Sequence, residues 1–376
     1  MPLRGRRHHG PHPPALLHPR QPRGDRARLR LDTALPGQPH EGPLPPLVHA
    51  DTPARALRRS AVHAARREIV SLPLVSVAIP AYNHAAYIEA CLASVCAQTY
   101  PELELVLIDD GSQDDTLEAA RRFLETRRER FRRIVLQRQD NQGVSGASNA
   151  AIAACQGKWV HLLGSDDVLH PAKIERIQQA ISDWDCSDLA LVHADAAYID
   201  QHGQPITRNR RAQRPAPGPD RQAWRALFMS DNFIINPTVA LRRDAFLAVG
   251  GFDRNLALED IDCWLRLSAR YAIARVPEEL ASYRKHPGNT LRRRVRMLGA
   301  QFHTFGKFLG EHGGLIPAAD IRRHFRRYLK RFWRRMRGRQ PWLFPLVMGA
   351  LLKSHLRTPQ PEDYRRFGRL LDGTAG

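Results

Sequence analysis

Four short apolar runs, each followed by a polar cluster, constrain the fold of this chain more than any other feature. The runs cover Leu74 to Pro80, Leu103 to Ile108, Arg133 to Gln137 and Trp159 to Leu163. The segments between them have helical spacing: 85–98, a charged stretch that ends near Arg128, and 144–155. Near-continuous apolar strands that alternate with helices are typical of a parallel sheet covered on both faces. We therefore expect an α/β fold in the middle of the chain.

The polar clusters predict where ligands bind. They read "AYNHAAY", "DDGSQDD", "DNQGVSGASN" and "GSDD", one after each run. In a parallel sheet the carboxyl ends of the strands meet at one edge, and ligands bind beyond that edge. Plain helix capping is the alternative for each cluster alone: Ser112 and Asp115 could form a capping box, and Asp167 could cap a helix after Pro171. Capping does not explain why all four clusters fall at the same edge.

Two adjacent acids, Asp166 and Asp167, follow the fourth run. We expect both to lie at a solvent-facing strand end. Carboxylate oxygens on such a rigid mount are the ligands that a hard divalent cation prefers. This pair is therefore the first candidate for a metal site.

The basic charge of the chain lies in its two ends. Residues 1–72 carry 13 Arg against 5 acids, and residues 287–376 carry 20 Lys and Arg against 5 acids. The formal net charge is +20, so the middle of the chain is slightly acidic. A nucleic-acid-binding protein would explain the excess of Arg, but the middle shows no recognition motif of that class. We expect no nucleic acid partner.

The first 72 residues are rich in Arg and Pro and have no sustained apolar period. This composition predicts disorder, because the segment has no core to bury. It also lacks the apolar stretch of a signal peptide. A second hypothesis is that these residues are translated DNA upstream of the true start codon.

Six motifs occur in this order: "SVAIPAYN", "VLIDDGSQDDT", "NQGVSGASNAAI", "GSDDVLHPAKIE", "GGFDRNLALEDIDCWLRL" and "YRKHPGNT". Together they resemble the family 2 glycosyltransferases with the GT-A fold, over residues 74–290. The resemblance implies a Rossmann-like GT-A domain at 73–290, with a mixed, mostly parallel sheet and flanking helices. It also implies an enzyme that takes a sugar from a nucleotide-diphosphate donor.

The resemblance implies roles for the residues that match these motifs. Donor contacts are implied at Pro80, Tyr82, Asn83, Asp109, Asp110, Asn141, Gly143, Asn149 and Asp166. The pair Asp109 and Asp110 would include the carboxylate that reads the donor's base, since an acid accepts the N3–H of uracil. Asp166, Asp167 and His286 would hold Mn²⁺ or Mg²⁺ on the diphosphate, where a cation offsets the charge of the leaving group. Many members have an acid at the position of Gly164 and an Arg at that of Ser148.

Glu259 and Asp260 open a predicted helix whose apolar face includes Ile261, Trp264, Leu265 and Leu267. Acids in a first turn are favoured by the helix dipole, which is the plain alternative. The resemblance implies catalytic carboxylates here, with Asp260 as the base. A single base that takes the acceptor's proton during attack gives inversion at the anomeric carbon.

These features predict a metal-dependent, inverting hexosyltransferase that uses a UDP-sugar. We expect a glycan or lipid-linked acceptor of cell-surface polysaccharide synthesis, with 195–231 shaping the acceptor side. A sugar nucleotidyltransferase is the competing enzyme, but no G-x-x-x-x-G-K-S/T loop is present.

The C-terminal segment, 291–376, predicts a basic amphipathic helical extension. In "RRHFRRYLKRFWRRMRGR" apolar residues recur at three- and four-residue steps between paired arginines. "PWLFPLVMGALL" follows and is too short to span a bilayer, which needs roughly twenty residues. One alternative packs the first helix on the catalytic domain with a solvated basic face. We favour the other, in which its aromatic face lies in an anionic membrane, and we expect a cytoplasmic protein peripheral to the inner face of the cell membrane.

Overall fold

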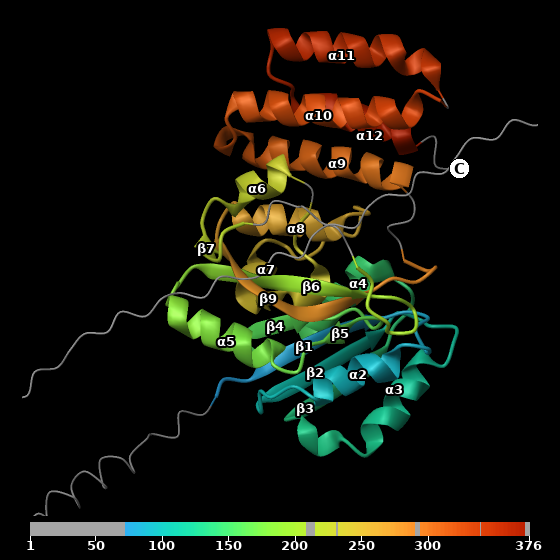
Figure 1. Ribbon diagram of the computed structural model, residues 1–376, viewed down its shortest axis with the longest axis vertical. Helices are drawn as coiled ribbons and strands as arrows, with labels where there is room; N and C mark the ends of the chain where they lie inside the picture. The colour runs from blue at the N-terminus through green and yellow to red at the C-terminus, as the bar shows by residue number, and fades with distance from the viewer. Residues whose placement is uncertain (1–71, 208–214, 231, 290–293, 339, 373–376) are drawn as a thin grey trace, which may run out of the picture. The chain divides into compact units, whose positions relative to one another are not determined.

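The computed structural model describes residues 72–207, 215–230, 232–289, 294–338 and 340–372 (Figure 1). The predictions of disorder and of an incorrect start concern residues 1–72, which lie outside this range except for Leu72. Part of the stretch expected to shape the acceptor side, 208–214, also lies outside it.

One sheet of nine strands organises the described chain, in the order β3-β2-β1-β4-β8-β6-β9-β5, with β7 paired to β9. Strands β3, β2, β1 and β4 are parallel, as are β6 and β9, whereas β8, β5 and β7 run antiparallel to their neighbours. The strands are β1 (Val75–Ala81), β2 (Leu103–Asp109), β3 (Arg133–Arg138), β4 (Trp159–Leu162), β5 (Val168–Leu169), β6 (Leu189–Ile199), β7 (Gly218–Asp220), β8 (Ala240–Arg242) and β9 (Ala272–Arg284). The four predicted parallel strands are confirmed as β1 to β4.

Helices cover both faces of this sheet (Figure 1). One face packs on α2 (Ile88–Cys96), α3 (Thr116–Glu125) and α5 (Lys173–Trp184), and the other on α4 (Gly143–Ala154), α6 (Ala223–Met229), α7 (Arg243–Ala248) and α8 (Glu259–Ser268). In β2, Leu105 and Leu107 belong to the first core, whereas Val106 and Ile108 belong to the second. Burial on both sides explains the continuous apolar run in the sequence.

Glycine at position 111 brings the loops after β2 and β3 together. Its φ of +75° lies in the left-handed region, which costs glycine little. A Cβ at Gly111 would lie 3.3 Å from both the amide nitrogen of Asn141 and the carbonyl oxygen of Gln139. The two polar loops predicted to share an edge are therefore in contact.

A layer of four helices follows the sheet domain and confirms the helical C-terminal extension. It contains α9 (Arg294–His312), α10 (Ala318–Met336), α11 (Phe344–Leu356) and α12 (Pro361–Asp372). Ion pairs join it to the preceding helices: Lys307 lies 2.7 Å from Asp253, and Arg225 lies 2.9 Å from Asp320. None of the described helices has the length and apolarity needed to cross a membrane.

The prediction that the aromatic face of α10 meets a membrane is wrong. Phe325, Tyr328, Leu329 and Phe332 are at most 2% exposed and belong to the same core as α8 and α9. Phe302 of α9 and Phe367 of α12 both pack against Phe332. Only the basic side of α10 faces solvent, as the alternative interpretation of this segment had it.

Candidate functional site

The loop after β1 is fastened to the loop after β2 by Asn83. The backbone of Asn83 has a φ of 53°, its N–H donates to Ser112 Oγ at 3.0 Å, and its Oδ1 accepts from the Gln113 N–H at 2.8 Å. The backbone N–H and the side chain of Asn83 therefore both hold the loop after β1 against the loop after β2. Pro80 lies near the end of β1, and the ring of Tyr82 beside it is exposed.

The two acids that follow β2 differ in their surroundings. Asp109 is fully buried; its Oδ2 accepts from the Ser112 N–H, and its Oδ1 has no hydrogen-bond partner among the described residues. Asp110 lies at the loop, and its Oδ1 accepts from Gln139 Nε2 at 2.7 Å and from the Gln142 N–H at 2.9 Å. Each acid has one oxygen engaged, but the second oxygen of Asp109 is buried inside β2, whereas Asp110 follows the strand in the loop, so Asp110 is the better candidate for contact with a ligand.

Asn141 lies in the loop before α4 and Gly143 is the first residue of that helix, and both are exposed. Gly143 has a φ of +76°, and its N–H donates to Asn141 Oδ1 at 3.3 Å. Asn149 has a different environment from the one expected, because its side-chain amide bonds the backbone N–H and carbonyl of Phe252, both at 2.9 Å. This side chain therefore joins α4 to the turn before α8 through one hydrogen bond at each of its two polar atoms, and its donor contact stays a prediction.

Asp166 and Asp167 point in different directions. Asp167 is 3% exposed, and its Oδ1 accepts from the Arg284 N–H at 2.8 Å. Burial, followed by the charge of Asp166, raises the pKa of Asp167 well above its ordinary value. The expectation that both carboxylates face solvent is thus wrong for Asp167, which neither caps α5 nor lies at the surface. Asp166 is the acid that faces the site.

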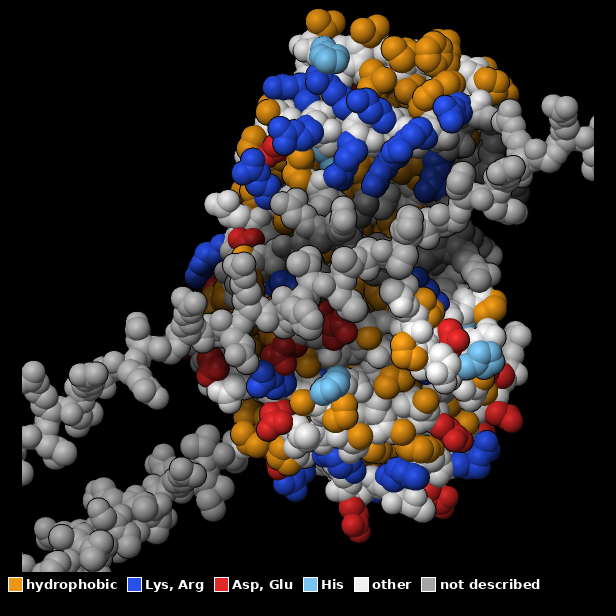
Figure 2. Space-filling view, in the orientation of Figure 1, with side chains coloured by type: hydrophobic (Ala, Val, Ile, Leu, Met, Phe, Trp, Pro, Cys, Tyr) orange, Lys and Arg blue, Asp and Glu red, His pale blue; other side chains and the backbone are white. Residues whose placement is uncertain are grey.

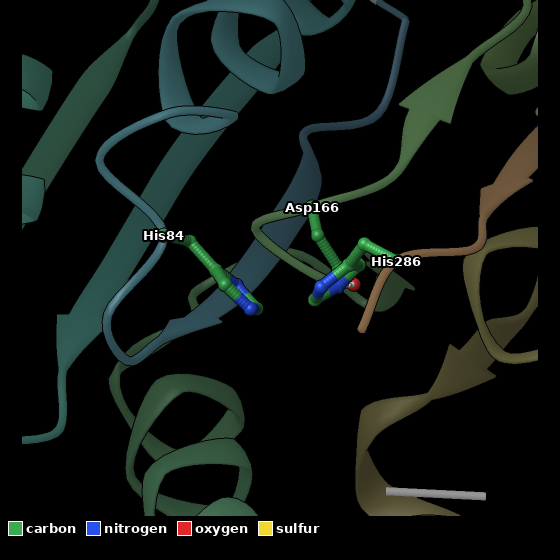
Figure 3. A group of neighbouring side chains, drawn as sticks. All are labelled: His84, Asp166 and His286. Atoms are coloured by element: carbon green, nitrogen blue, oxygen red, sulfur yellow. Dashed lines mark hydrogen bonds and ion pairs between the residues drawn. The ribbon is translucent and has the colours of Figure 1, made fainter. Parts of the chain in front are cut away.

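Three side chains form a group that could hold a metal ion: His84, Asp166 and His286 (Figure 3). One ring nitrogen of each histidine and one carboxylate oxygen lie within 4.8 Å of one another. His286 Nε2 lies 2.9 Å from Asp166 Oδ2, and His84 Nδ1 lies 2.7 Å from the hydroxyl of Ser165. The three residues come from the loops that follow β1, β4 and β9.

Asp166 and His286 of the predicted metal site lie together in this group, which contains His84 and not Asp167; the ligand roles themselves stay a prediction. The sequence prediction missed His84, although it lies in the first polar cluster, because a single histidine carries no spacing signal. Burial lowers the pKa of His84, which favours the neutral imidazole that can ligate a cation. Gly164 makes room for the arrangement, since a Cβ there would lie 2.8 Å from Asp166 Oδ1.

The donor set fits a divalent cation. One carboxylate and two imidazoles suit Mn²⁺ better than Mg²⁺, because Mg²⁺ prefers a shell made of oxygen atoms. The oxygen atoms of a bound diphosphate would complete such a shell. The chemistry of this group is therefore compatible with the predicted divalent cation.

Glu259 and Asp260 begin α8, as predicted, and the four apolar residues that follow them are buried. Asp260 Oδ2 accepts from Asn232 Nδ2 at 2.8 Å, which fixes the carboxylate. Burial raises the pKa of Asp260, although the Ile261 N–H and the Asn232 amide partly oppose this. Burial and the charge of Asp260 raise the pKa of Glu259 to about 8. A carboxylate with a raised pKa is a stronger base than one in water.

Tyr283 connects the metal group to the carboxylates of α8. Burial raises its pKa, and the negative charges of Asp167, Asp166 and Asp260 raise it further. The phenol of Tyr283 is thus close enough to both parts of the site to sense each charge. The pKa of Tyr283 thus responds to charges from both groups of residues.

A cavity of 330 Å³ reaches the residue that follows Asn232 in the chain. Phe233, the next residue, lines it together with His193, Asp195 and Arg275. Asp195 and Arg275 form an ion pair at 2.7 Å, and both side chains are 10% exposed. Burial lowers the pKa of His193 to about 4, so its ring is neutral at pH 7. The cavity offers an aromatic ring and several polar groups beside the candidate base.

The model of Glycosyl transferase family 2 matches residues 76–250 of this chain. The uncharacterized protein MT1568 of Mycobacterium tuberculosis is 32% identical over 233 residues, which are 59% of this chain and 70% of that protein. A chondroitin synthase of Escherichia coli is 39% identical over 136 residues, 36% of this chain and 19% of the synthase. A PGL/p-HBAD biosynthesis glycosyltransferase of Mycobacterium bovis is 38% identical over 121 residues, 32% of this chain and 46% of that protein. The chain thus spans less than half of these last two proteins.

The chain belongs to the family 2 glycosyltransferases, and its sheet and helices form a GT-A fold. Two solved structures are similar to it at low identity. Staphylococcus aureus TarS 1–349 in complex with UDP-GlcNAc is 18% identical, with 80% of this chain and 92% of that chain covered and a TM-score of 0.49. The mannosyltransferase PcManGT of Pyrobaculum calidifontis, in complex with GDP-Man and Mn²⁺, is 17% identical, with coverages of 85% and 93% and a TM-score of 0.47.

Proposed function

We propose that the protein is an inverting, metal-dependent hexosyltransferase that moves a sugar from a UDP-sugar to a hydroxyl of a glycan or lipid-linked acceptor. The proposal includes a role in cell-surface polysaccharide synthesis at the cytoplasmic face of the membrane. The observation that supports it most is that this member of the glycosyltransferase family has both a group able to hold a metal ion and a carboxylate that Asn232 fixes at the start of α8. A family 2 transferase needs both, one for the leaving group and one for the acceptor.

On the donor side, Asp110 reads the base through its free oxygen, and Pro80, Tyr82 and Asn83 form the wall of the nucleotide pocket. The exposed ring of Tyr82 is placed to stack on a base. Asn141 and Gly143, at the start of α4, offer polar groups to the ribose and the sugar of the donor. Asn149 contributes to the site indirectly, because its side chain holds the turn that precedes α8 and the candidate base.

His84, Asp166 and His286 would hold Mn²⁺ beside the diphosphate. A bound cation would offset the negative charge that the diphosphate gains as its bond to the sugar lengthens. Asp167 helps to position Asp166, because its carboxylate accepts a hydrogen bond from the Arg284 N–H and so holds the loop after β4 in place. Arg284 also donates from Nε to the carbonyl oxygen of Asp166 at 2.7 Å, which fixes the loop from a second side.

Asp260 is the proposed base. It takes the proton of the acceptor hydroxyl while that oxygen attacks the anomeric carbon, and the electron pair of the broken bond leaves with the diphosphate. Asn232 holds the carboxylate in place, and burial keeps it basic. The pKa of Glu259 is raised to about 8, so Glu259 is largely protonated at neutral pH, and we assign the role of base to Asp260.

We place the acceptor in the cavity beside Phe233. An aromatic ring stacks on the apolar face of a sugar, and the paired Asp195 and Arg275 can bond its hydroxyls. Sugar hydroxyls both donate and accept hydrogen bonds, so a lining that offers both kinds of group suits them. This agrees with the expectation that 195–231 shapes the acceptor side.

A screen of nucleoside-diphosphate sugars with Mn²⁺ tests the proposal. We expect release of UDP from one UDP-sugar, slow without an acceptor, and a raised melting temperature with the same donor. Asp260→Asn is the matched control, which should keep donor binding and lose transfer. The product's anomeric proton coupling in NMR reports inversion. Pyrophosphate release from a nucleoside triphosphate and a sugar 1-phosphate would support a nucleotidyltransferase instead.

A further inference from the structure

Helix α11 is apolar on its outer face as well as on its inner face. Val347 of α11 and Leu343, just before the helix, are buried in the core that includes α10. The ring of Phe344 lies 5.2 Å from that of Trp333, at the edge of this contact. The outer face carries Phe344, Met348, Leu352 and Leu356 at four-residue steps, and Trp342 lies just before the helix. Their exposed fractions are 68% for Trp342, 47% for Phe344, 38% for Met348, 63% for Leu352 and 87% for Leu356.

Exposed apolar side chains in such a row favour a partner surface that removes them from water. Single apolar residues on a surface are normal, but a contiguous strip marks an interaction site. Figure 2 shows apolar side chains gathered over α11 at one end of the molecule, and a band of Lys and Arg beside them over α10. We call the five exposed side chains from Trp342 to Leu356 the α11 strip.

The charge around the strip decides what covers it. Residues 344–356 contain no acid, and the exposed side of α10 carries Arg323, Lys330, Arg334, Arg335 and Arg337. The five acids of the helical layer are engaged: Asp320, Glu362, Asp363 and Asp372 each lie within 3 Å of a basic side chain, and Glu311 lies 3.9 Å from His312. The acids of the helical layer therefore do not neutralise the exposed basic side chains beside the strip. A second copy of this surface would repel it.

We propose that the α11 strip inserts into the interface of an anionic membrane, with the arginines of α10 against the lipid headgroups. This rests on the proposed function in one respect, because a lipid-linked acceptor gives the docking its purpose. Trp and Phe at one end of an apolar helix suit the headgroup level, and arginines beside it add attraction to anionic lipid. The anchoring element is α11, whereas α10 supplies charge and keeps its aromatic face inside the protein.

Flotation of the full chain with vesicles tests the proposal. The vesicles are phosphatidylcholine with and without phosphatidylglycerol, across a salt series. We expect binding only to the anionic vesicles, with a decrease as salt shortens the Debye length from about 10 Å at 0.1 M to about 3 Å at 1 M. The paired substitution Leu352→Glu and Leu356→Glu should lower vesicle affinity by about tenfold or more per leucine, since each loses its apolar burial.

Leu247→Glu is the matched control, because Leu247 is 46% exposed on α7, away from the strip. It should float like the wild type, and all variants should melt at the same temperature. Equal flotation of the paired variant and the wild type would overturn the proposal, as would no flotation at low salt. A dimer in light scattering that the paired variant dissociates would also overturn it, in favour of a second copy.

UDP release in solution, without vesicles, separates this proposal from the proposed function. A protein that floats but hydrolyses no nucleotide sugar keeps the docking surface and loses the enzyme assignment. A protein that turns over a donor but never floats loses only the docking surface.

Discussion

Replacing Lys173 with methionine should stabilise this protein, and by an amount that the structure bounds. Lys173 lies in the first turn of α5, is fully buried, and donates from Nζ to the Val239 carbonyl at 3.4 Å. No carboxylate pairs with it among the described residues. Burial lowers its pKa from 10.5 to about 7. The Val239 carbonyl also accepts from the Leu162 N–H at 3.1 Å, so it keeps a partner in the variant.

The pKa difference sets the magnitude and the pH window. Lys173 has a pKa of 10.5 when exposed and about 7 when folded, and each unit corresponds to about 1.4 kcal/mol. The burial penalty is therefore at most about 5 kcal/mol. Between about pH 7 and 10.5 the unfolded chain holds the proton and the folded chain does not. Stability should thus rise with pH across this window, and the full penalty applies below it.

Urea unfolding at pH 6.5, 7.5 and 9.5 measures the free energy of unfolding across this pH window. Lys173→Met should raise the free energy of unfolding by a few kcal/mol at pH 6.5, and its advantage should shrink as the pH rises. Lys158→Met, at an exposed lysine before β4, is the control and should change little. A wild type whose stability is flat over this range, or a Lys173→Met protein no more stable at pH 6.5, would refute the reasoning.

Three further changes concern the site. Asp166→Asn and His84→Ala should each lower Mn²⁺ affinity by at least about tenfold in calorimetry or EPR; unchanged affinity in either would remove that residue from the metal site. Asp260→Asn should reduce kcat by about 10²- to 10⁴-fold with donor affinity near normal, and a loss of donor affinity with normal kcat would contradict its role. Asn232→Ala removes a hydrogen bond that lowers the pKa of Asp260, so the acidic limb of kcat/KM should move to higher pH; an unmoved limb would argue against Asp260 as the base.

The parallel strands could be predicted because their chemistry is local. Each is buried on both faces, so an apolar run and its polar end are visible without knowledge of the partner strand. The edge where the polar clusters meet follows from the same rule. The apolar face of α8 was visible for a similar reason, since its spacing shows in ten residues.

The orientation of the two acids after β4 could not be predicted. Asp167 turns inward because the Arg284 N–H, 117 residues later in the chain, offers it a hydrogen bond. That backbone group leaves no mark in the sequence. His84 was missed for the same reason: its importance depends on Asp166 and His286, which other loops bring to it. Asn149 matches a family motif, yet Phe252 occupies its amide.

The C-terminal helices show why an amphipathic pattern does not identify a membrane-facing surface. A strong apolar stripe indicates that one face of a helix is shielded from water, but either lipid or another part of the protein can shield it. In α10 the stripe meets α9 and α12, so its pattern records internal packing. In α11 the pattern is weak because both faces are apolar, although only the inner face is buried against the rest of the protein. An apolar outer face is then left over, and apolar residues that internal packing does not use are the stronger sign of an external partner.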